Sequence, residues 1–419
     1  MTNDARNSRN GAESASPRVD LNRLKILVVC QYYWPEPFPL EDICEELVKR
    51  GHEVDVITGV PNYPMGYIYD EYKNGKNRNQ VHNGVNIHRC FTVARRKNHV
   101  FRLLNYLSFA ASSTLHVLAS KEKYDVVFGV QTSPILMSYA ALAYAKKHKI
   151  KSILYSVDLW PASLSVGGVR STSLLYRLFG IASKHIYRNA DEILISSQSF
   201  RTYLRDEFQI ADERIIYHPQ YAIDQFRGIP PKTSRGETFE FVFAGNIGAA
   251  QSLNTIIEAA DILRNEAEIR FHIVGDGSEL GNLRKHAEKL ALENVIFHGR
   301  KPLADMPQYY AMADAMLVTL TEDPFISMTL PGKVQTYMAA GKPIIAAADG
   351  EIALTLKEAE CGFCVNAGDA AGLADAIRRF VRLDNTAQMG ANARAYYEMM
   401  FSRERFMDVL EDRLKNASC

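Results

Sequence analysis

Short runs of β-branched and aliphatic residues alternate with helix-period segments along almost the whole chain. Residues 24–30 (LKILVVC) and 53–58 (EVDVIT) have the composition of buried strands, and residues 40–50 between them have the spacing of a helix. Continuous apolar strands separated by helices are typical of parallel βαβ units. Further strands are expected at residues 126–130, 152–157, 192–196 and 214–217.

The same alternation restarts after a polar stretch at residues 228–237, which we interpret as a linker. The sequence therefore predicts an α/β protein with two doubly wound, Rossmann-like domains facing a central cleft, with ligand bound at the carboxyl ends of the strands. The expected parts are a disordered tail, a first domain, a second domain and a terminal helix returning to the first domain, at residues 1–20, 21–230, 231–391 and 392–419. Strands of the second domain are expected at residues 240–244, 270–274, 295–298, 315–320 and 344–346.

Length and composition agree with this division and restrict the class of protein. A chain of 419 residues is too long for one ordinary core, and its net charge of +1 gives no reason to expect a nucleic-acid partner. The six cysteines are scattered, which suits a reducing cytosol. The tail lacks the apolar core of a signal peptide, and no apolar run is long enough to span a membrane. We therefore expect a cytoplasmic protein that is soluble or peripheral to the membrane.

Candidate chemistry gathers where strands of the second domain end. In residues 243–248 (FAGNIG) a strand ends, and Gly245 and Gly248 open a turn into a helix. Glycine lets the backbone approach a ligand closely, and a helix N-terminus offers unpaired N–H groups. The segment Gly245, Asn246, Ile247 and Gly248 therefore suits a diphosphate. An ordinary tight turn explains it equally well, because the third glycine of the dinucleotide fingerprint is missing.

Two further turns end at the same edge of the predicted sheet. Gly277 belongs to a Gly-Asp-Gly turn, for which helix capping by Asp276 is the favoured interpretation. Arg300 and Lys301 follow Gly299 at the end of the next strand. Their basic side chains would project toward the same edge, and a solvated loop is the alternative.

Residues 330–346 (LPGKVQTYMAAGKPIIA) have the pattern of a helix start, a short helix, a stop and a strand. Lys333, Gln335 and Thr336 lie on or just before the first turn. A lysine there opposes the helix dipole, at a cost of roughly a few tenths of a kcal/mol, unless an anion is present. We therefore predict that Lys333 binds an anion beside the glycine loop and that Thr336 donates to a ligand hydroxyl. The side chain of Gln335 can face either way. For Lys333, the alternative to anion binding is an ordinary surface lysine beside a helix start.

These segments resemble the donor half of a GT-B glycosyltransferase of family four. The resemblance rests on FAGNIG, VGDGSEL, HGRKPLADMPQYYAMAD and residues 333–346. In the first domain, KILVVCQYYWPE, KRGHEVDVITGVPNYPMG and LYSVDLWPASL resemble a bacterial branch from surface-polysaccharide gene clusters. That branch includes transferases of N-acetyl-L-fucosamine in O-antigen and capsule assembly. The resemblance extends from about residue 24 to residue 414.

The resemblance implies a retaining transfer of a sugar from a nucleotide donor, with uracil as the base, no cofactor and no required metal. The nucleotide-sugar donor would lie against the second domain, and a lipid-linked saccharide acceptor would enter from the first. Gly245 to Gly248 would approach the diphosphate, the turn from His298 to Arg300 would flank the base, and Lys333 would meet phosphate oxygens. Preorganised N–H groups and cations stabilise the anion that leaves.

The chain departs from the family pattern at three positions. Many relatives carry a basic residue after the first glycine of the loop and a lysine five residues further on, where this chain has Asn246 and Gln251. Many also carry a glutamate, held to bind the donor ribose, where this chain has Thr336. On this hypothesis Lys333 supplies the cation that the loop lacks, and the Thr336 hydroxyl substitutes for a carboxylate.

Candidates in the first domain are less specific. Relatives often place a histidine beside the sugar, whereas the loop here reads Val-Asp-Leu-Trp-Pro at residues 157–161. Asp158 is the candidate for contacting the transferred sugar or the acceptor hydroxyl, and turn formation before the proline explains it equally well. Glu36 and Asn62, in the loops after the first two strands, are candidates for the acceptor side.

A basic cluster at residues 95–97 precedes a segment rich in aromatic and aliphatic side chains, residues 101–109. A lipid-linked acceptor would place the enzyme at the inner face of the inner membrane, where such a patch binds anionic lipid. A helix packed on the sheet after a solvated loop is the alternative.

Two other functions share this architecture. A nucleotide-sugar 2-epimerase requires several acidic and histidine groups converging on the sugar, and this sequence offers few. A non-catalytic subunit that binds a nucleotide sugar would account for the missing charges at Asn246, Gln251 and Thr336.

Overall fold

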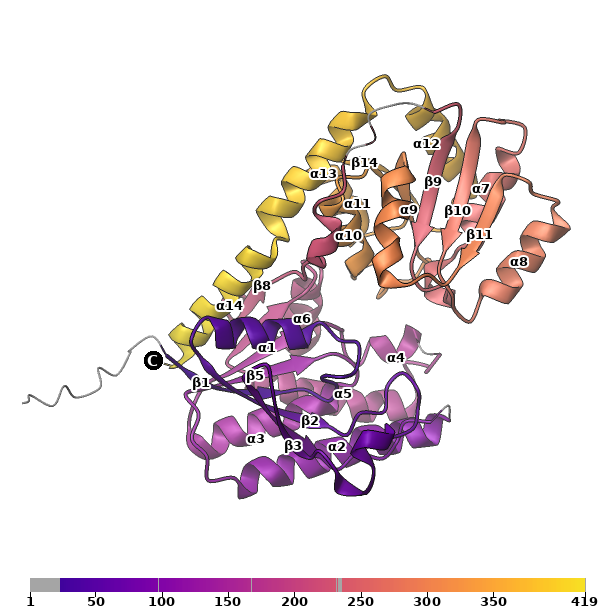
Figure 1. Ribbon diagram of the computed structural model, residues 1–419. Helices are drawn as coiled ribbons and strands as arrows, with labels where there is room; N and C mark the ends of the chain where they lie inside the picture. Colours follow the sequence, from indigo (N-terminus) through magenta and orange to yellow (C-terminus); the bar gives the residue numbers. More distant parts are fainter. Residues whose placement is uncertain (1–22, 97, 167, 231, 233–235, 419) are drawn as a thin grey trace, which may run out of the picture.

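The computed structural model describes residues 23–96, 98–166, 168–230, 232 and 236–418, which form two α/β domains (Figure 1). Each domain is built around one sheet, with the strand orders β3-β4-β2-β1-β5-β6-β7-β8 and β11-β10-β9-β12-β13-β14. This confirms the predicted pair of doubly wound domains. The predicted tail and part of the linker lie outside the described residues.

The first sheet is parallel except at one edge, where β3 pairs antiparallel with β4. These two strands are not predicted from the sequence, because their residues alternate between polar and apolar, as suits an edge with one covered face. The central strands are buried on both faces and therefore give the continuous apolar runs. The strands are β1 (Lys25–Val29), β2 (Glu53–Gly59), β3 (Asn79–His82), β4 (Val85–Cys90), β5 (Val126–Gln131), β6 (Ser152–Ser156), β7 (Glu192–Ile195) and β8 (Ile215–Tyr217).

Helices cover both faces of the first sheet. Side chains of β1 alternate between the two cores, so that Val28 packs with α1 and α14 whereas Val29 packs with α2 and α3. Of the helices in the described ranges, none combines the length and apolarity needed to cross a membrane. The covering helices are α1 (Leu40–Lys49) and α14 (Arg403–Ser418) on one face and α2 (His99–Ala119), α3 (Tyr139–His148) and α5 (Leu174–Asn189) on the other, with α4 (Ser163–Val166) and α6 (Phe200–Phe208) beside them.

The second sheet is parallel throughout and is also covered on both faces. Its strands are β9 (Phe239–Ala244), β10 (Ile269–Val274), β11 (Val295–Gly299), β12 (Ala315–Thr319), β13 (Ile344–Ala347) and β14 (Gly362–Val365). One face packs on α7 (Asn254–Ile262), α8 (Leu280–Lys289) and α12 (Ala370–Val381). The other packs on α9 (Met306–Met312), α10 (Gly332–Ala339), α11 (Glu351–Ala359) and α13 (Thr386–Met400).

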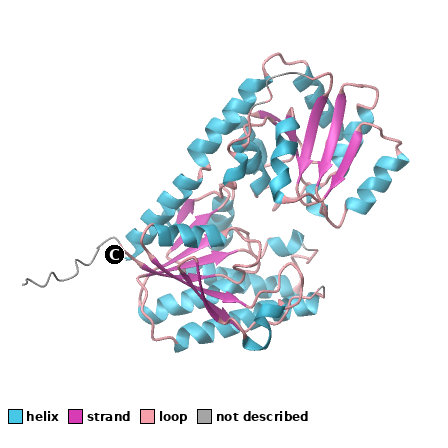
Figure 2. Cartoon of the chain, in the orientation of Figure 1, coloured by secondary structure: helices cyan, strands magenta, loops and turns pink. Residues whose placement is uncertain are grey.

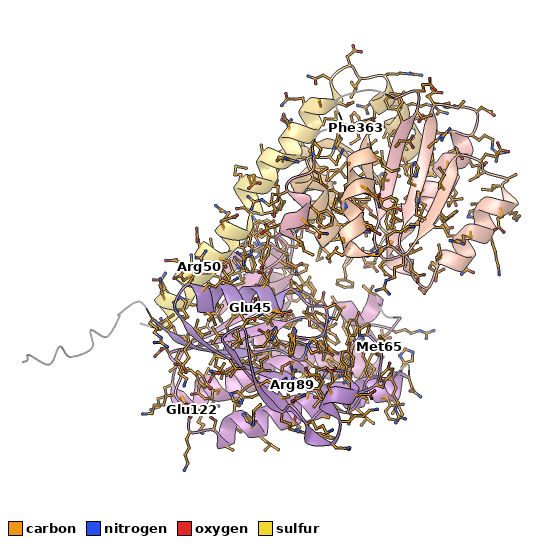
Figure 3. All side chains as sticks on the ribbon, viewed as in Figure 1. Glu45, Arg50, Met65, Arg89, Glu122 and Phe363 are labelled. Atoms are coloured by element: carbon orange, nitrogen blue, oxygen red, sulfur yellow. The ribbon has the colours of Figure 1, made fainter. Side chains whose placement is uncertain are left out.

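The C-terminal segment, expected as one helix, forms two that break at residues 401–402 (Figure 2). α13 packs against α10 in the second domain, whereas Phe406 of α14 belongs to the core of the first. Arg50, beside α14, pairs with Asp408 and Glu411 at 2.8 and 2.7 Å (Figure 3). The end of the chain therefore ties the second domain back to the first.

Candidate functional site

The two domains enclose a cavity of about 330 Å³ between the carboxyl ends of their strands. The first domain contributes the loop after β5 and the segment from the end of β6 through α4. The second contributes the loop after β9 and the segment between β12 and α10. The lining residues are Ser133, Asp158, Leu159, Ala162, Ser163, Val166, Ala250, Gln251, Leu320, Phe325, Ile326, Thr329 and Pro331. Asp158 and Gln251, both predicted site residues, thus face one cavity from opposite domains.

Lys333 lies in the first turn of α10, which begins after Pro331 as the sequence predicts. Its amine donates a hydrogen bond to Oε1 of Gln251 and lies 4.1 Å from the centre of the Phe243 ring. A Cβ on Gly245 would lie 3.5 Å from the same nitrogen, so the amine stands directly over the glycine loop. The fold therefore brings Lys333 and Gly245 together with Gln251, which lines the cavity.

Burial lowers the pKa of Lys333 to about 7. Its described neighbours offer an amide oxygen and an aromatic face, and no carboxylate among them pairs with the amine. An ammonium group without a counter-ion in such surroundings is unfavourable, and an anion beside it restores the charged form. The position is therefore suited to an anionic group of a ligand.

The two glycine turns pack backbone against backbone. Gly245 and Gly275 have φ values of 148° and 149°, which side chains with a Cβ rarely adopt. A Cβ on Gly275 would collide with the carbonyl oxygen of Gly245, and a Cβ on Gly277 would collide with that of Ile247. The backbone N–H of Ile247 donates to Asp276 O at 2.9 Å. The close approach of the two turns accounts for Gly277 without a ligand.

The other candidates of the second domain differ in what their side chains contact. Asn246 is exposed, whereas the Ile247 side chain belongs to the core. The Thr336 hydroxyl donates to the Gly332 carbonyl of its own helix at 2.8 Å. Gln335 is 1% exposed, and neither of its amide atoms has a hydrogen-bond partner among the described residues. Ile247 is thus open to a ligand only through its backbone, and Gln335 does not line the cavity.

His298 ends a row of hydrogen bonds that crosses three strands. Its Nε2 lies 2.8 Å from Nδ1 of His272, and Nε2 of His272 lies 2.5 Å from Oε2 of Glu240. Burial, followed by the charges of His272 and Lys301, lowers the pKa of His298. If Glu240 accepts from His272 and His272 accepts from neutral His298, Nδ1 of His298 remains as an acceptor. Arg300 is exposed just beyond β11.

Asp158 follows β6 in a loop that Gln131 holds in place. Nε2 of Gln131 donates to the Asp158 carbonyl at 3.0 Å, and Oε1 of Gln131 accepts from the Ser156 hydroxyl at 2.8 Å. Burial raises the pKa of Asp158, although the neighbouring Ser133 hydroxyl opposes this shift. Because Gln131 is fully buried, the core of the first domain fixes the position of this loop.

Asp158 also lines a second cavity, of about 290 Å³, in the first domain. Its wall is mainly aromatic and aliphatic, and it includes Tyr32, Phe38, Tyr155, Tyr221 and Phe406. Among the described residues of this wall there is no arginine or lysine. Asp158 therefore stands between the inter-domain cavity and an apolar one.

Glu36 and Asn62 lie together, but they line neither cavity. Oε1 of Glu36 accepts from the backbone N–H groups of Asn62 and Tyr63, at 2.8 and 2.7 Å. Burial raises the pKa of Glu36 to about 7 in spite of these bonds. Asn62 accepts from the backbone N–H of Arg95 at 3.0 Å. The contacts of both side chains thus hold the loops of the first domain together.

Sequence patterns give no sign of three residues that shape the site. Ser133 lies beside the carboxyl of Asp158, and Phe243 lies beneath the amine of Lys333. Glu351 accepts from the backbone N–H groups of Gln198 and Ser199, both at 2.9 Å, across the domain boundary. A serine, a phenylalanine or a glutamate is unremarkable in each of these sequence segments. The residue that each of them contacts becomes visible only in the folded structure.

One group of described side chains has the spacing of metal ligands, namely Glu41, Glu45 and His82. These residues belong to α1 and β3 and line neither cavity. Independence from a metal therefore stays a prediction.

Two family descriptions match the two domains in turn. Residues 225–396 match "Glycosyl transferases group 1", and residues 40–219 match "Glycosyltransferase Family 4". Each description covers one of the two domains that flank the cavity, and together they identify the fold of the chain as GT-B, with one domain matching group 1 and the other family 4.

Individual relatives agree with this assignment. The chain is 27% identical over 331 residues to "Probable glycosyltransferase WbjE" of Pseudomonas aeruginosa, covering 75% of this chain and 80% of the relative. It is 26% identical over 407 residues to "Putative colanic acid biosynthesis glycosyl transferase WcaI" of Escherichia coli (strain K12), covering 92% and 98%. The crystal structure of Anabaena Alr3699/HepE in complex with UDP matches with a TM-score of 0.67 at 16% identity, over 94% of this chain and all of that one. The fold and family predictions are confirmed, whereas these comparisons do not extend to the sugar.

Proposed function

We propose that the chain transfers a sugar from a UDP-linked donor to a lipid-linked saccharide, with retention of the anomeric configuration and without a metal. The observation that carries the proposal is the buried amine of Lys333, which stands over Gly245 and donates to Gln251, a residue that lines the inter-domain cavity. A nucleoside diphosphate leaves as an anion, and a preorganised cation beside backbone N–H groups stabilises the charge that develops.

Two observations support UDP as the nucleotide. The structural neighbour HepE forms a complex with UDP. In the tautomer in which Glu240 accepts from His272 and His272 accepts from His298, Nδ1 of His298 is an acceptor, which suits the N3–H group of uracil. Because of the resemblance to N-acetyl-L-fucosamine transferases, UDP-N-acetyl-L-fucosamine is the first donor to test.

The second cavity supports a neutral sugar as the acceptor. Its described wall offers aromatic and aliphatic side chains and the carboxyl of Asp158, with no cation to pair with a phosphate. In the proposed complex Asp158 contacts the acceptor hydroxyl, because it borders both cavities. The relative WcaI bears a name from colanic acid biosynthesis, which supports a role in surface-polysaccharide assembly at the inner face of the inner membrane.

The alternatives receive less support. An epimerase requires acidic and histidine groups around the sugar, and Asp158 is the one titratable side chain among the described residues that line the inter-domain cavity. No observation on the described residues favours a non-catalytic subunit.

Incubation of the protein with UDP-sugars and a water-soluble saccharide carrying a short alkyl chain tests the proposal. We expect UDP release together with a glycoside of retained configuration, identified by mass and by NMR, with chelator causing no loss. Release of an epimerised free sugar would favour the epimerase, and UDP binding without any turnover would favour the non-catalytic subunit.

A further inference from the structure

Three of the helices that cover one face of the first domain carry no acidic side chain, whereas α6 on the same face carries Asp206 and Glu207. α2, α3 and α5 are 21, 10 and 16 residues long and contain neither aspartate nor glutamate. α1 and α14, on the opposite face, are 10 and 16 residues long and carry Glu41, Asp42, Glu45, Glu46, Glu404, Asp408, Glu411 and Asp412. The net charge of α2, α3 and α5 together is therefore positive, whereas that of α1 and α14 together is negative.

The three helices α2, α3 and α5 are basic. They carry Arg102, Lys146, Lys147, Arg177, Lys184 and Arg188. Such a one-sided distribution is unexpected for a chain whose net charge is +1, and it favours contact with an anionic surface.

α2 adds an outward stripe of aliphatic side chains. Val100, Leu104, Leu107, Leu115 and Leu118 are all exposed, and Leu115 is 69% exposed. Their spacing of three, four or eight residues places them on one side of the helix. The inward side is occupied by residues such as Phe109, which is fully buried.

α5 carries a second stripe of exposed aliphatic side chains. Leu174, Leu178 and Ile181 follow the same spacing, and Leu174 and Ile181 are 73% and 69% exposed. Leu103 of α2 packs on the core cluster that includes Phe179 of α5, so the two stripes belong to neighbouring helices. An aliphatic surface of this extent, rimmed by cations, is typical of an interaction site.

We propose that this face, formed by α2, α3 and α5, binds the surface of an anionic lipid bilayer. The inference deepens the proposed function, on which it rests for the lipid-linked acceptor. Val166 is exposed, lines the inter-domain cavity and lies eight residues before Leu174. The start of α5 therefore brings the lipid surface close to the cavity where the acceptor would react.

This surface overlaps in part with the patch predicted from the sequence, because Leu104 and Leu107 belong to both, and Arg96 of that patch is exposed. The guanidinium of Arg95 contacts the Tyr32 hydroxyl at 3.3 Å and lies over the rings of Tyr63 and Tyr106, so it is occupied within the protein. Lys97 lies outside the described residues, and Tyr106 and Phe109 are buried. The aliphatic stripes, and the cations on α3 and α5, extend that patch along the helices of this face.

Flotation of the full chain with vesicles tests this assignment. We expect binding to vesicles of phosphatidylcholine and phosphatidylglycerol in equal parts and little binding to phosphatidylcholine alone. The triple variant L174Q/L178Q/I181Q should bind the anionic vesicles at least tenfold more weakly, and so should L104Q/L107Q/L115Q. Glutamine keeps the helix propensity of leucine while removing the apolar contact.

A matched control uses exposed aliphatic residues of the second domain. Leu303 and Leu354 are 52% and 55% exposed, and L303Q/L354Q should leave vesicle binding unchanged. Equal loss in the control, or no loss in either triple variant, would overturn the assignment. A dimer in vesicle-free solution that the α5 variant dissociates would also overturn it, since a second copy would then cover the face.

The same variants separate this inference from the proposed function. Transfer to the water-soluble acceptor should be retained in both triple variants. If the parent protein binds vesicles but transfers no sugar, the proposed function is contradicted, whereas the assignment of the lipid-binding face is retained.

Discussion

The two walls of the inter-domain cavity are built in different ways. On the side of the second domain two glycine turns are in backbone contact, and the amine of Lys333 lies over Gly245 and donates to Gln251, which lines the cavity. The wall of the first domain consists of a loop fixed by side chains, in which Gln131 holds the backbone of Asp158. The first arrangement is formed mainly by short sequence motifs that can be recognised in the sequence. The second depends on residues that meet only in the folded chain.

Substitution of Lys333 by alanine should have the largest effect on the reaction. Loss of one preorganised charge contact lowers kcat/KM on the order of a hundredfold. Steady-state rates with a UDP-sugar and a soluble acceptor measure this. Gln251→Ala, which removes the oxygen that the amine contacts and leaves its charge, should cost much less. Activity of Lys333→Ala within about twofold of the parent would refute a phosphate role for this wall.

Asp158→Asn should impair the opposite wall selectively. Loss of a charged hydrogen bond to the acceptor or the sugar lowers kcat on the order of thirtyfold. Affinity for UDP, measured by calorimetry, should stay close to that of the parent, because Asp158 lies in the first domain. If Asp158→Asn loses UDP affinity as strongly as Lys333→Ala, then the assignment of nucleotide binding to the second domain alone is wrong.

The pH dependence of UDP binding sharpens the role of Lys333. Burial holds its pKa at about 7 in the free protein, and the diphosphate binds the protonated amine. Affinity for UDP should therefore fall about tenfold for each pH unit above 7, as the amine loses its proton. Calorimetry between pH 8 and 9 measures this, in a range where the phosphates of UDP are almost fully ionised. Lys333→Arg, which stays charged, should give a flat profile, and a falling profile in that variant would assign the effect to another group.

The smallest effect on transfer is expected at Glu36, whose contacts are structural. Glu36→Ala should destabilise the fold by about 2 kcal/mol below pH 7, since two buried N–H groups lose their acceptor. Glu36→Gln keeps an acceptor and should cost less. Denaturant unfolding measures both variants. Equal loss in the two variants would argue against the hydrogen bonds as the cause.

Stability should also vary with pH through this residue. The folded-state pKa of Glu36 is raised to about 7, above its usual value of 4.5. Its contribution is therefore fully present at low pH and is lost as the pH rises through 7. Denaturant unfolding of the parent should reveal this decline, and Glu36→Gln should flatten it. An unchanged slope in the variant would exclude Glu36 as its source.

The same contrast, between local sequence patterns and contacts made only in the folded chain, explains which strands and helices the sequence predicts. Central parallel strands such as β5 are buried on both faces, so their apolar runs identify them. β3 and β4 lie at an edge and alternate with polar residues, which hides them among loop segments. The break between α13 and α14 is also missed, because the helical pattern continues through it while its packing changes from one domain to the other.

The candidate site divides in the same way. Lys333 is predictable because a lysine at a helix start conflicts with the local dipole. Phe243 beneath it and Ser133 beside Asp158 are not, because each meets its partner only after the chain has folded. Gln335 illustrates the limit, since its position beside Lys333 in the sequence says nothing about which side of α10 it occupies. It is buried and lines neither cavity.

Lys333 should determine how tightly the protein binds its nucleotide. Thermal denaturation of the parent and of Lys333→Ala with UDP, GDP, ADP and CDP tests this. At about 100 times its dissociation constant a nucleotide stabilises the folded state by roughly 2.7 kcal/mol, which is readily seen as a rise in Tm. We predict a clear rise with UDP in the parent and a much smaller one in the variant at the same concentration. No rise with any nucleotide, or an equal rise in both proteins, would contradict the assignment.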